Sequence, residues 1–144
     1  MIPRSTSSEW KSAKNAEKYL PLLRSAELKY GLPRDLLARM AYQESHFRND
    51  IVSGKVKSAA GALGLMQIVP KWHPAADPLN VPAAIDYAAR YIKQLYAQFG
   101  MWSLAVAAYN FGPGNVAKTP RAQWPAETRN YVAEIFGDLP GALA

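Results

Sequence analysis

Glu44 is the residue of this chain best placed for acid–base chemistry. At about 100° per residue on a helix, Leu37, Met40, Glu44 and Phe47 fall on one stripe, so a carboxyl group stands where packing favours an apolar side chain. Burial disfavours a charged carboxylate, so we expect Glu44 to keep its proton to higher pH than a free glutamate. A protonated carboxyl is a proton donor, which general-acid cleavage of an acetal requires because the leaving oxygen departs poorly without a proton. The alternative is a solvated Glu44 near a helix end.

The elements that must position Glu44 are predicted helices. A first helix from residue 9 to 20 is capped by Ser8 and broken at Pro21, and a second run ends at Gly31, which suits a left-handed helix end. Pro33 then opens the helix of Glu44 at a first-turn position, where the missing N–H of proline does no harm.

The rest of the chain is also predicted to be helical, with loops at the proline-rich segments. The expected order is an exposed excursion over 48–60, a short helix within 61–69, an ordered loop over 70–82, helices over 83–99 and 102–109, a tight turn over 110–114, a turn of helix over 115–117 and a last helix over 127–136. No sustained alternation of apolar and polar residues is present, so the predicted fold class is all-α, or α with a very small β element. We expect a disordered lead over residues 1–7 and one domain over 8–144.

Composition limits the function classes. The chain has 144 residues, 49% of them hydrophobic, which is enough for one domain with a real core. Its formal charge of +6 suits a polyanionic partner such as a cell-wall polymer, nucleic acid or an anionic membrane, and equally a merely soluble basic surface. The absence of cysteine excludes disulfides, thiolate metal sites and a cysteine nucleophile. His46 and His73 lack the paired ligands of a metal site, so a solvated or capping role is expected for both.

Four ordered blocks of residues resemble the soluble lytic transglycosylases, lysozyme-like enzymes that cleave the glycan strands of peptidoglycan. The resemblance covers residues 19–136. The blocks are Glu44-Ser45-His46-Phe47, the segment from Ser58 through Gly61-Ala62-Leu63-Gly64-Leu65-Met66-Gln67, the segment Ala107-Ala108-Tyr109-Asn110-Phe111-Gly112-Pro113-Gly114, and Glu127-Thr128-Arg129-Asn130-Tyr131-Val132.

The resemblance implies a lysozyme-like domain with a substrate groove and a role for each block. Glu44 falls on the family's catalytic acid. The implied substrate-binding residues are Ser58, Met66, Gln67, Tyr109, Asn110, Glu127 and Tyr131. No cofactor and no metal are implied.

The chemistry of these side chains agrees with such roles, although simpler interpretations exist. Gln67 offers an amide that both donates and accepts hydrogen bonds to a sugar, whereas Met66 by itself fits a core position better. The amide of Asn110 can hold an acetamido group, and the phenol of Tyr109 can form a hydrogen bond with the catalytic carboxyl. Alternatively, Asn110 simply ends a helix. Glu127 follows a proline and could equally serve the positive end of a helix.

The implied reaction is cleavage of the β-1,4 bond between N-acetylmuramic acid and N-acetylglucosamine without net hydrolysis. Glu44 donates a proton to the glycosidic oxygen and then takes one from the C6 hydroxyl of the muramoyl sugar, which gives a 1,6-anhydro product. Ordinary glycosidases use two carboxylates. Three alternatives remain: a goose-type muramidase that uses water, a non-catalytic peptidoglycan-binding module, and a basic nucleic-acid-binding helical protein, for which no recognition helix is visible.

The implied partner is the peptidoglycan glycan strand, bound by a monomer that neither inserts into a membrane nor binds nucleic acid. Residues 1–8 lack the apolar run of a secretory signal, and no segment has the length of a membrane span. Action in the periplasm or cell wall then needs another route, so we expect a phage-encoded enzyme, released at lysis or carried in the virion.

Two features depart from the family pattern. The loop between Asn49 and Ser58 is several residues longer than usual, which affects the rim of the groove. Ala84-Ile85 and Ala88 replace residues common in the family, which we interpret as a packing detail.

Overall fold

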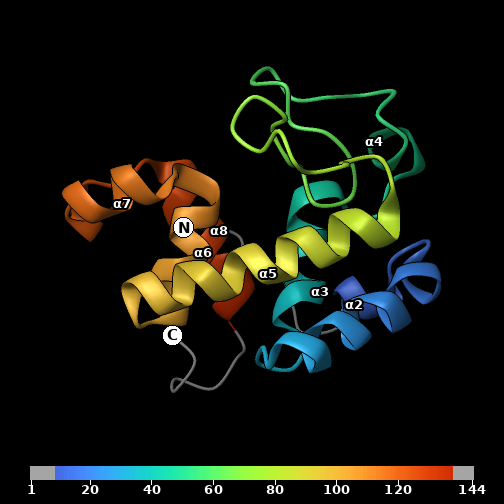
Figure 1. The fold of residues 1–144 in the computed structure, drawn as a ribbon, viewed down its shortest axis with the longest axis horizontal. Coiled ribbons are helices and arrows are strands. Elements are labelled where there is room, and N and C mark those ends of the chain that lie inside the picture. The colour runs from blue at the N-terminus through green and yellow to red at the C-terminus, as the bar shows by residue number, and fades with distance from the viewer. Residues whose placement is uncertain (1–8, 138–144) are drawn as a thin grey trace. The chain divides into compact units, whose positions relative to one another are not determined.

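The computed structural model describes residues 9–137, and these are mostly helical (Figure 1). No strand is present within this range; Leu63 and Ile68 form an isolated antiparallel bridge. The all-α prediction with a very small β element is therefore confirmed. The described residues fall into two compact units that divide after Arg90. The expected lead over residues 1–7 lies outside the described range, and the expected single domain over 8–144 stays a prediction.

The N-terminal unit is built on two packed helices, α2 and α3. Its helices are α1 (Glu9–Ser12), α2 (Ala16–Tyr30), α3 (Leu36–Ser45), α4 (Asn49–Val52) and the first half of α5 (Val81–Phe99). A long irregular segment over residues 53–80 lies between α4 and α5 (Figure 1). The core includes Leu23, Leu36, Leu37 and Met40, whose side chains have no exposed surface.

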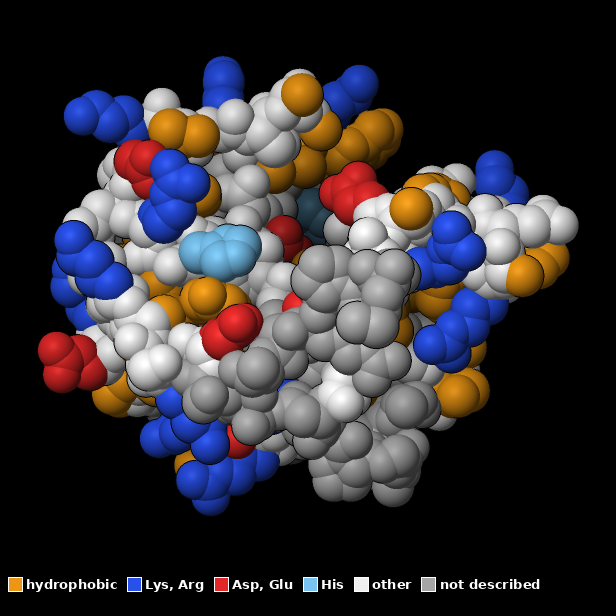
Figure 2. Space-filling model, turned by 180° about the vertical axis from the view of Figure 1, so that it is seen from behind, with side chains coloured by type: hydrophobic (Ala, Val, Ile, Leu, Met, Phe, Trp, Pro, Cys, Tyr) orange, Lys and Arg blue, Asp and Glu red, His pale blue; other side chains and the backbone are white. Residues whose placement is uncertain are grey.

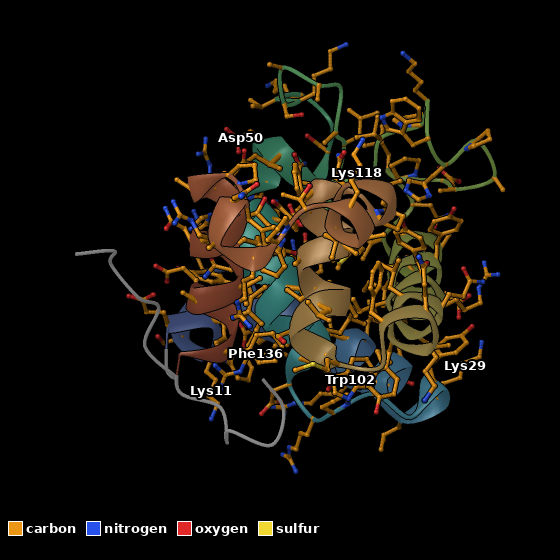
Figure 3. The ribbon with its side chains drawn as sticks, turned by 90° about the vertical axis from the view of Figure 1, so that its left-hand side faces the viewer. Lys11, Lys29, Asp50, Trp102, Lys118 and Phe136 are labelled. Atoms are coloured by element: carbon orange, nitrogen blue, oxygen red, sulfur yellow. The ribbon has the colours of Figure 1, made fainter. Side chains whose placement is uncertain are left out.

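The C-terminal unit is organised around α6, which contacts both α7 and α8. It holds the second half of α5 and then α6 (Trp102–Phe111), α7 (Pro113–Lys118), a 3-10 turn (Arg121–Gln123) and α8 (Ala126–Phe136). Trp102, labelled in Figure 3, lies in the first turn of α6. Its ring stacks on that of Tyr96, with centroids 3.9 Å apart and planes 9° from parallel. Helix α6 is apolar on almost every side, which indicates a buried helix. Its buried residues are Ser103, Ala105, Val106, Ala107 and Ala108.

The predicted helix break at Pro21 is wrong, because α2 runs through this proline and the break falls at residues 13–15. Asn15 adopts a left-handed backbone conformation with φ 71°. Its side-chain amide donates to the backbone carbonyl of Phe47 at 2.8 Å and to the side-chain oxygen of Asn49 at 3.1 Å. Pro21, the sixth residue of α2, has no N–H to donate within the helix, yet the helix continues through it. The break lies instead beside Asn15, whose side chain is held by Phe47 and Asn49.

The predicted start of the Glu44 helix at Pro33 is also wrong, because α3 begins at Leu36. Asp35, the residue before it, has φ 69° and makes no side-chain cap. The carboxylate of Glu27 takes that role from α2: it accepts hydrogen bonds from the backbone N–H groups of Asp35 at 2.9 Å, Leu37 at 2.9 Å and Ala38 at 3.1 Å. The first N–H groups of a helix lack internal partners, so a side chain distant from the helix start satisfies them here.

The segment 61–69 forms a turn and not the predicted short helix. Leu63 and Ile68 exchange backbone hydrogen bonds of 3.0 Å in both directions. Gly64 at φ 80° and Gln67 at φ 50° occupy left-handed conformations between them, which no helix can include. In contrast, Gly31 ends α2 as predicted, with φ 66°.

Removing the Glu27 carboxylate should destabilise the fold. Glu27 is 3% exposed, so Glu27→Ala leaves buried N–H groups at the start of α3 without an acceptor. We expect a loss of about 3 kcal/mol in the free energy of unfolding, measured by urea denaturation. Glu27→Gln keeps one acceptor and should lose less. Glu17→Gln, at an exposed position of the same helix, should change little; equal losses for all three variants would contradict the capping role.

The Glu27 carboxyl should also make stability depend on pH. Burial raises its pKa above the ordinary value of 4.5, while the backbone donors near Asp35, Ala38 and Leu37 oppose the rise. A group with a raised folded-state pKa stabilises the fold most below its unfolded pKa, and the contribution is lost as pH rises through the folded pKa. The stability of the wild type relative to Glu27→Gln should therefore be greatest at acidic pH and decline upward from about pH 4.5; a difference that grows with pH would contradict this.

Candidate active site

Glu44 is the penultimate residue of α3, and its side chain is partly buried. The three apolar residues that share its stripe, Leu37, Met40 and Phe47, have no exposed surface. Glu44 therefore lies at the edge of a core, on the apolar stripe that the sequence pattern predicts. This is a setting in which a carboxyl is partly desolvated and still reachable.

The backbone turns sharply directly after Glu44. His46 and Phe47 have φ values of 51° and 57°, so two consecutive non-glycine residues adopt left-handed conformations. Such residues are uncommon and need support from their surroundings. Ser45 supplies part of it: its buried hydroxyl donates to the carbonyl of Ala41 at 3.0 Å and accepts from the N–H of Phe47 at 3.2 Å.

Phe47 supplies the rest of the support. Its ring lies 5.7 Å from that of Tyr19 and 5.6 Å from that of Tyr42, measured between centroids. Its carbonyl accepts the amide hydrogen bond of Asn15. Burial raises the pKa of both tyrosines, so they remain neutral. The serine and phenylalanine that follow Glu44 thus fix the turn that ends its helix, which gives the Glu-Ser-x-Phe spacing a physical reason.

The segment from Ser58 to Gln67 carries three of the predicted substrate-binding residues in the same unit. The hydroxyl of Ser58 is exposed and accepts the N–H of Ala62 at 2.9 Å, which leaves its own proton available to donate. The side-chain amide of Gln67 donates to the carbonyl of Gly64 at 2.9 Å. Met66 has no exposed surface, so its side chain lies in the core and offers no face to a ligand in this structure.

The C-terminal unit carries the remaining predicted residues. Tyr109 and Asn110 lie near the end of α6 and are partly buried, and the ring of Tyr109 lies 5.8 Å from that of Tyr91. Asn110 accepts a hydrogen bond of 2.8 Å from the hydroxyl of Thr128 on α8. Tyr131 is 8% exposed.

Glu127 is exposed and lies in the first turn of α8. At this position a carboxylate interacts favourably with the positive end of the helix. The interpretation that Glu127 stabilises the positive end of α8 therefore has a structural basis. Its role in substrate binding stays a prediction.

Neither histidine belongs to a cluster of acidic, histidine or cysteine side chains that could hold a metal; within residues 9–137 no group of three or more such residues occurs. His46 is exposed, as expected. His73 differs from the expectation of a solvated or capping role, because its Nδ1 lies 2.8 Å from the hydroxyl of Tyr87 and burial lowers its pKa. Neutral His73 is therefore a packing and hydrogen-bonding residue of the loop before α5.

Three side chains that matter for this geometry were not identified from the sequence: Asn15, Glu27 and Thr128. Each acts on a distant segment through a hydrogen bond. Thr128 belongs to a block that resembles the family, but its residue type and position alone indicate no role. Ala84 and Ala88, which depart from the family pattern, have no exposed surface. Their burial agrees with a packing role.

Comparison with known proteins identifies the family. The family model described as the Transglycosylase SLT domain matches residues 21–132, so the chain belongs to this family. It is 32% identical over 122 residues to the membrane-bound lytic murein transglycosylase C of Serratia proteamaculans, with 85% of this chain and 28% of that protein covered. It is 34% identical over 133 residues to the membrane-bound lytic murein transglycosylase F of Saccharophagus degradans, with 85% and 23% covered.

A solved structure shows the same architecture. The chain resembles lytic transglycosylase Slt from Pseudomonas aeruginosa, determined as an inactive glutamate-to-glutamine mutant, with a TM-score of 0.67 and 30% sequence identity. The match covers 86% of this chain and 23% of that one. The chain thus spans about a quarter of the length of these relatives.

Gly64 should be the more sensitive of two glycines in the Ser58–Gln67 segment. A Cβ atom at Gly64 would collide with the carbonyl oxygen of Pro78, whereas one at Gly61 would meet nothing within 4 Å. Both have positive φ, 80° and 86°, so alanine strains the backbone equally at each. We expect Gly61→Ala to cost about 1 kcal/mol and Gly64→Ala clearly more, measured from urea midpoints. Equal costs would show that Pro78 moves away freely.

Proposed function

We propose that this chain is the catalytic domain of a peptidoglycan lytic transglycosylase, with Glu44 as the acid and base. Its substrate is the β-1,4 bond between N-acetylmuramic acid and N-acetylglucosamine, and its site of action is the periplasm or cell wall. The observation that carries the proposal is the position of Glu44: a partly buried glutamate at the end of α3, directly before the Ser45–Phe47 turn, in a chain that belongs to the SLT family.

The reaction proceeds in two proton transfers. In the first, the protonated carboxyl of Glu44 donates to the glycosidic oxygen, the bond from that oxygen to the anomeric carbon breaks, and N-acetylglucosamine leaves with its hydroxyl restored. The acetamido carbonyl of the muramoyl sugar supports the positive charge. In the second, the carboxylate of Glu44 takes the proton of the C6 hydroxyl as that oxygen bonds to the anomeric carbon. The product is 1,6-anhydro-N-acetylmuramic acid, and no water is consumed.

We assign glycan binding to residues of the Ser58–Gln67 segment and to residues of α6 and α8. Ser58 and Gln67 have exposed or partly exposed polar groups on the loop segment, and Tyr109 and Asn110 have them at the end of α6. Hydroxyl, amide and phenol groups suit the mixed donor and acceptor pattern of an N-acetylated sugar. Glu127 and Tyr131 are assigned to the same role on the family resemblance. Met66 supports the turn from the core.

The competing functions have less support. Nucleic-acid binding was considered because of the formal charge of +6. On the face shown in Figure 2, however, the Lys and Arg side chains lie in separate groups and form no continuous patch. None of the helices described for this chain has both the length and the apolar character needed to cross a membrane. The glutamate-to-glutamine change that accompanies inactivity in the Slt relative favours an enzyme over a binding module.

Replacing the acid should abolish turnover and keep the fold. Glu44→Gln retains the size and a carbonyl of the side chain but can neither donate an acidic proton nor accept one back. We expect release of soluble fragments from purified peptidoglycan to fall about 100-fold or more, with the thermal midpoint within a few degrees of the wild type. Glu17→Gln, the same change at an exposed position of α2, is the matched control and should be fully active. Activity retained by Glu44→Gln removes Glu44 from the proposed role.

A further inference from the structure

The hydrogen bond between α8 and α6 fixes the orientation of the Asn110 amide. Thr128, the third residue of α8, is 2% exposed, and its hydroxyl donates to the side-chain carbonyl oxygen of Asn110 at 2.8 Å. The two helices pack against each other within the C-terminal unit. The hydroxyl of Thr128 is therefore held by the packing of its helix, and Asn110 must face it with its oxygen.

The orientation determines what Asn110 can offer to a ligand. A side-chain amide has an oxygen that accepts and an NH₂ group that donates, and these two project in different directions from the same carbon. With the oxygen turned toward Thr128, the NH₂ group turns away from it. Asn110 is partly exposed, near the C-terminal end of α6. Its free hydrogen-bonding capacity is therefore mainly that of a donor, which fits a carbonyl oxygen and not an N–H group.

We propose that Thr128 is a positioning residue that makes Asn110 a hydrogen-bond donor to the acetamido carbonyl of the glycan. This inference rests on the proposed function and adds a selectivity to it. Asn110 touches the substrate and Thr128 acts only through Asn110. A sugar that keeps its N-acetyl group presents the carbonyl that Asn110 needs, whereas a de-N-acetylated sugar presents an ammonium group, which is a second donor facing the NH₂ of Asn110.

A simpler role for Thr128 is to fill space near the start of α8. Valine has nearly the same shape as threonine and lacks the hydroxyl, so Thr128→Val keeps the packing and removes the orienting bond. Serine keeps the hydroxyl and loses the methyl group, so Thr128→Ser does the reverse. The pair separates orientation from packing. Thr119→Val, at a partly buried position of the same unit, controls for the chemical change itself.

A double-mutant cycle tests whether Thr128 acts through Asn110. The variants are Thr128→Val, Asn110→Ala and the two combined, and the readout is kcat/KM for soluble fragment release from N-acetylated peptidoglycan, with urea denaturation in parallel. We expect Thr128→Val to lower kcat/KM about 10-fold in the wild-type background and less than about 2-fold in the Asn110→Ala background. Thr128→Ser should recover most of the wild-type value. Fully additive losses, or Thr128→Val with wild-type kcat/KM, would overturn the proposal.

A binding measurement tests the selectivity without turnover. The Glu44→Gln variant is titrated with a chitin oligosaccharide and with the corresponding glucosamine oligosaccharide at equal chain length. We expect it to prefer the N-acetylated oligosaccharide, and the preference to fall when Thr128→Val or Asn110→Ala is added. An unchanged preference in both would overturn the inference. If the wild type releases no fragments from peptidoglycan, the proposed function fails, while this titration still decides the role of Thr128.

Discussion

A buried carboxylate at one end of a helix and a left-handed turn at the other hold Glu44, the residue on which the proposed chemistry depends. Glu27 accepts three backbone hydrogen bonds at the start of α3, and Ser45 and Phe47 fix the turn at its end. A ten-residue helix is marginal in isolation. The two ends, supplied by α2 and by the residues after Glu44, make it a rigid support for the carboxyl that it carries.

This arrangement suits a reaction in which one carboxyl performs both proton transfers. A residue that donates a proton and later accepts one must remain within reach of two different oxygen atoms while the sugar rearranges. The position of Glu44 at the edge of the core limits its movement, and its partial exposure allows a substrate to reach it. The chain belongs to the family described as the Transglycosylase SLT domain. In the proposed mechanism Glu44 is the protein group that transfers protons, while the substrate itself supplies the acetamido carbonyl and the nucleophile.

Much of the helical fold follows from the sequence, and the sequence also singles out Glu44 as the proposed acid. The helices α5, α6 and α8 were predictable because the sequence of each has a periodic or almost wholly apolar pattern. Glu44 stood out as a carboxyl on an apolar stripe. The binding residues were assigned through family blocks, and those assignments stay predictions, although the buried Met66 is better explained as core.

What the sequence did not reveal depends on long-range contacts. Nothing in the local pattern marks Glu27 as a cap for a helix that begins nine residues later, or Asn15 as a partner of Phe47. The turn at Gly64 was predicted as a helix because its apolar residues fit that pattern, but a carbonyl of Pro78 occupies the space that a side chain would need. In each case a tertiary contact overrides a local preference.

The central claim is that the C6 hydroxyl of the substrate, activated by Glu44, replaces water as the nucleophile. Digestion of purified peptidoglycan in water enriched in oxygen-18, followed by mass spectrometry of the new muramoyl ends, tests it most directly. The account predicts anhydro ends with no oxygen-18. Reducing ends that carry one oxygen-18 atom would contradict it and show that Glu44 activates water.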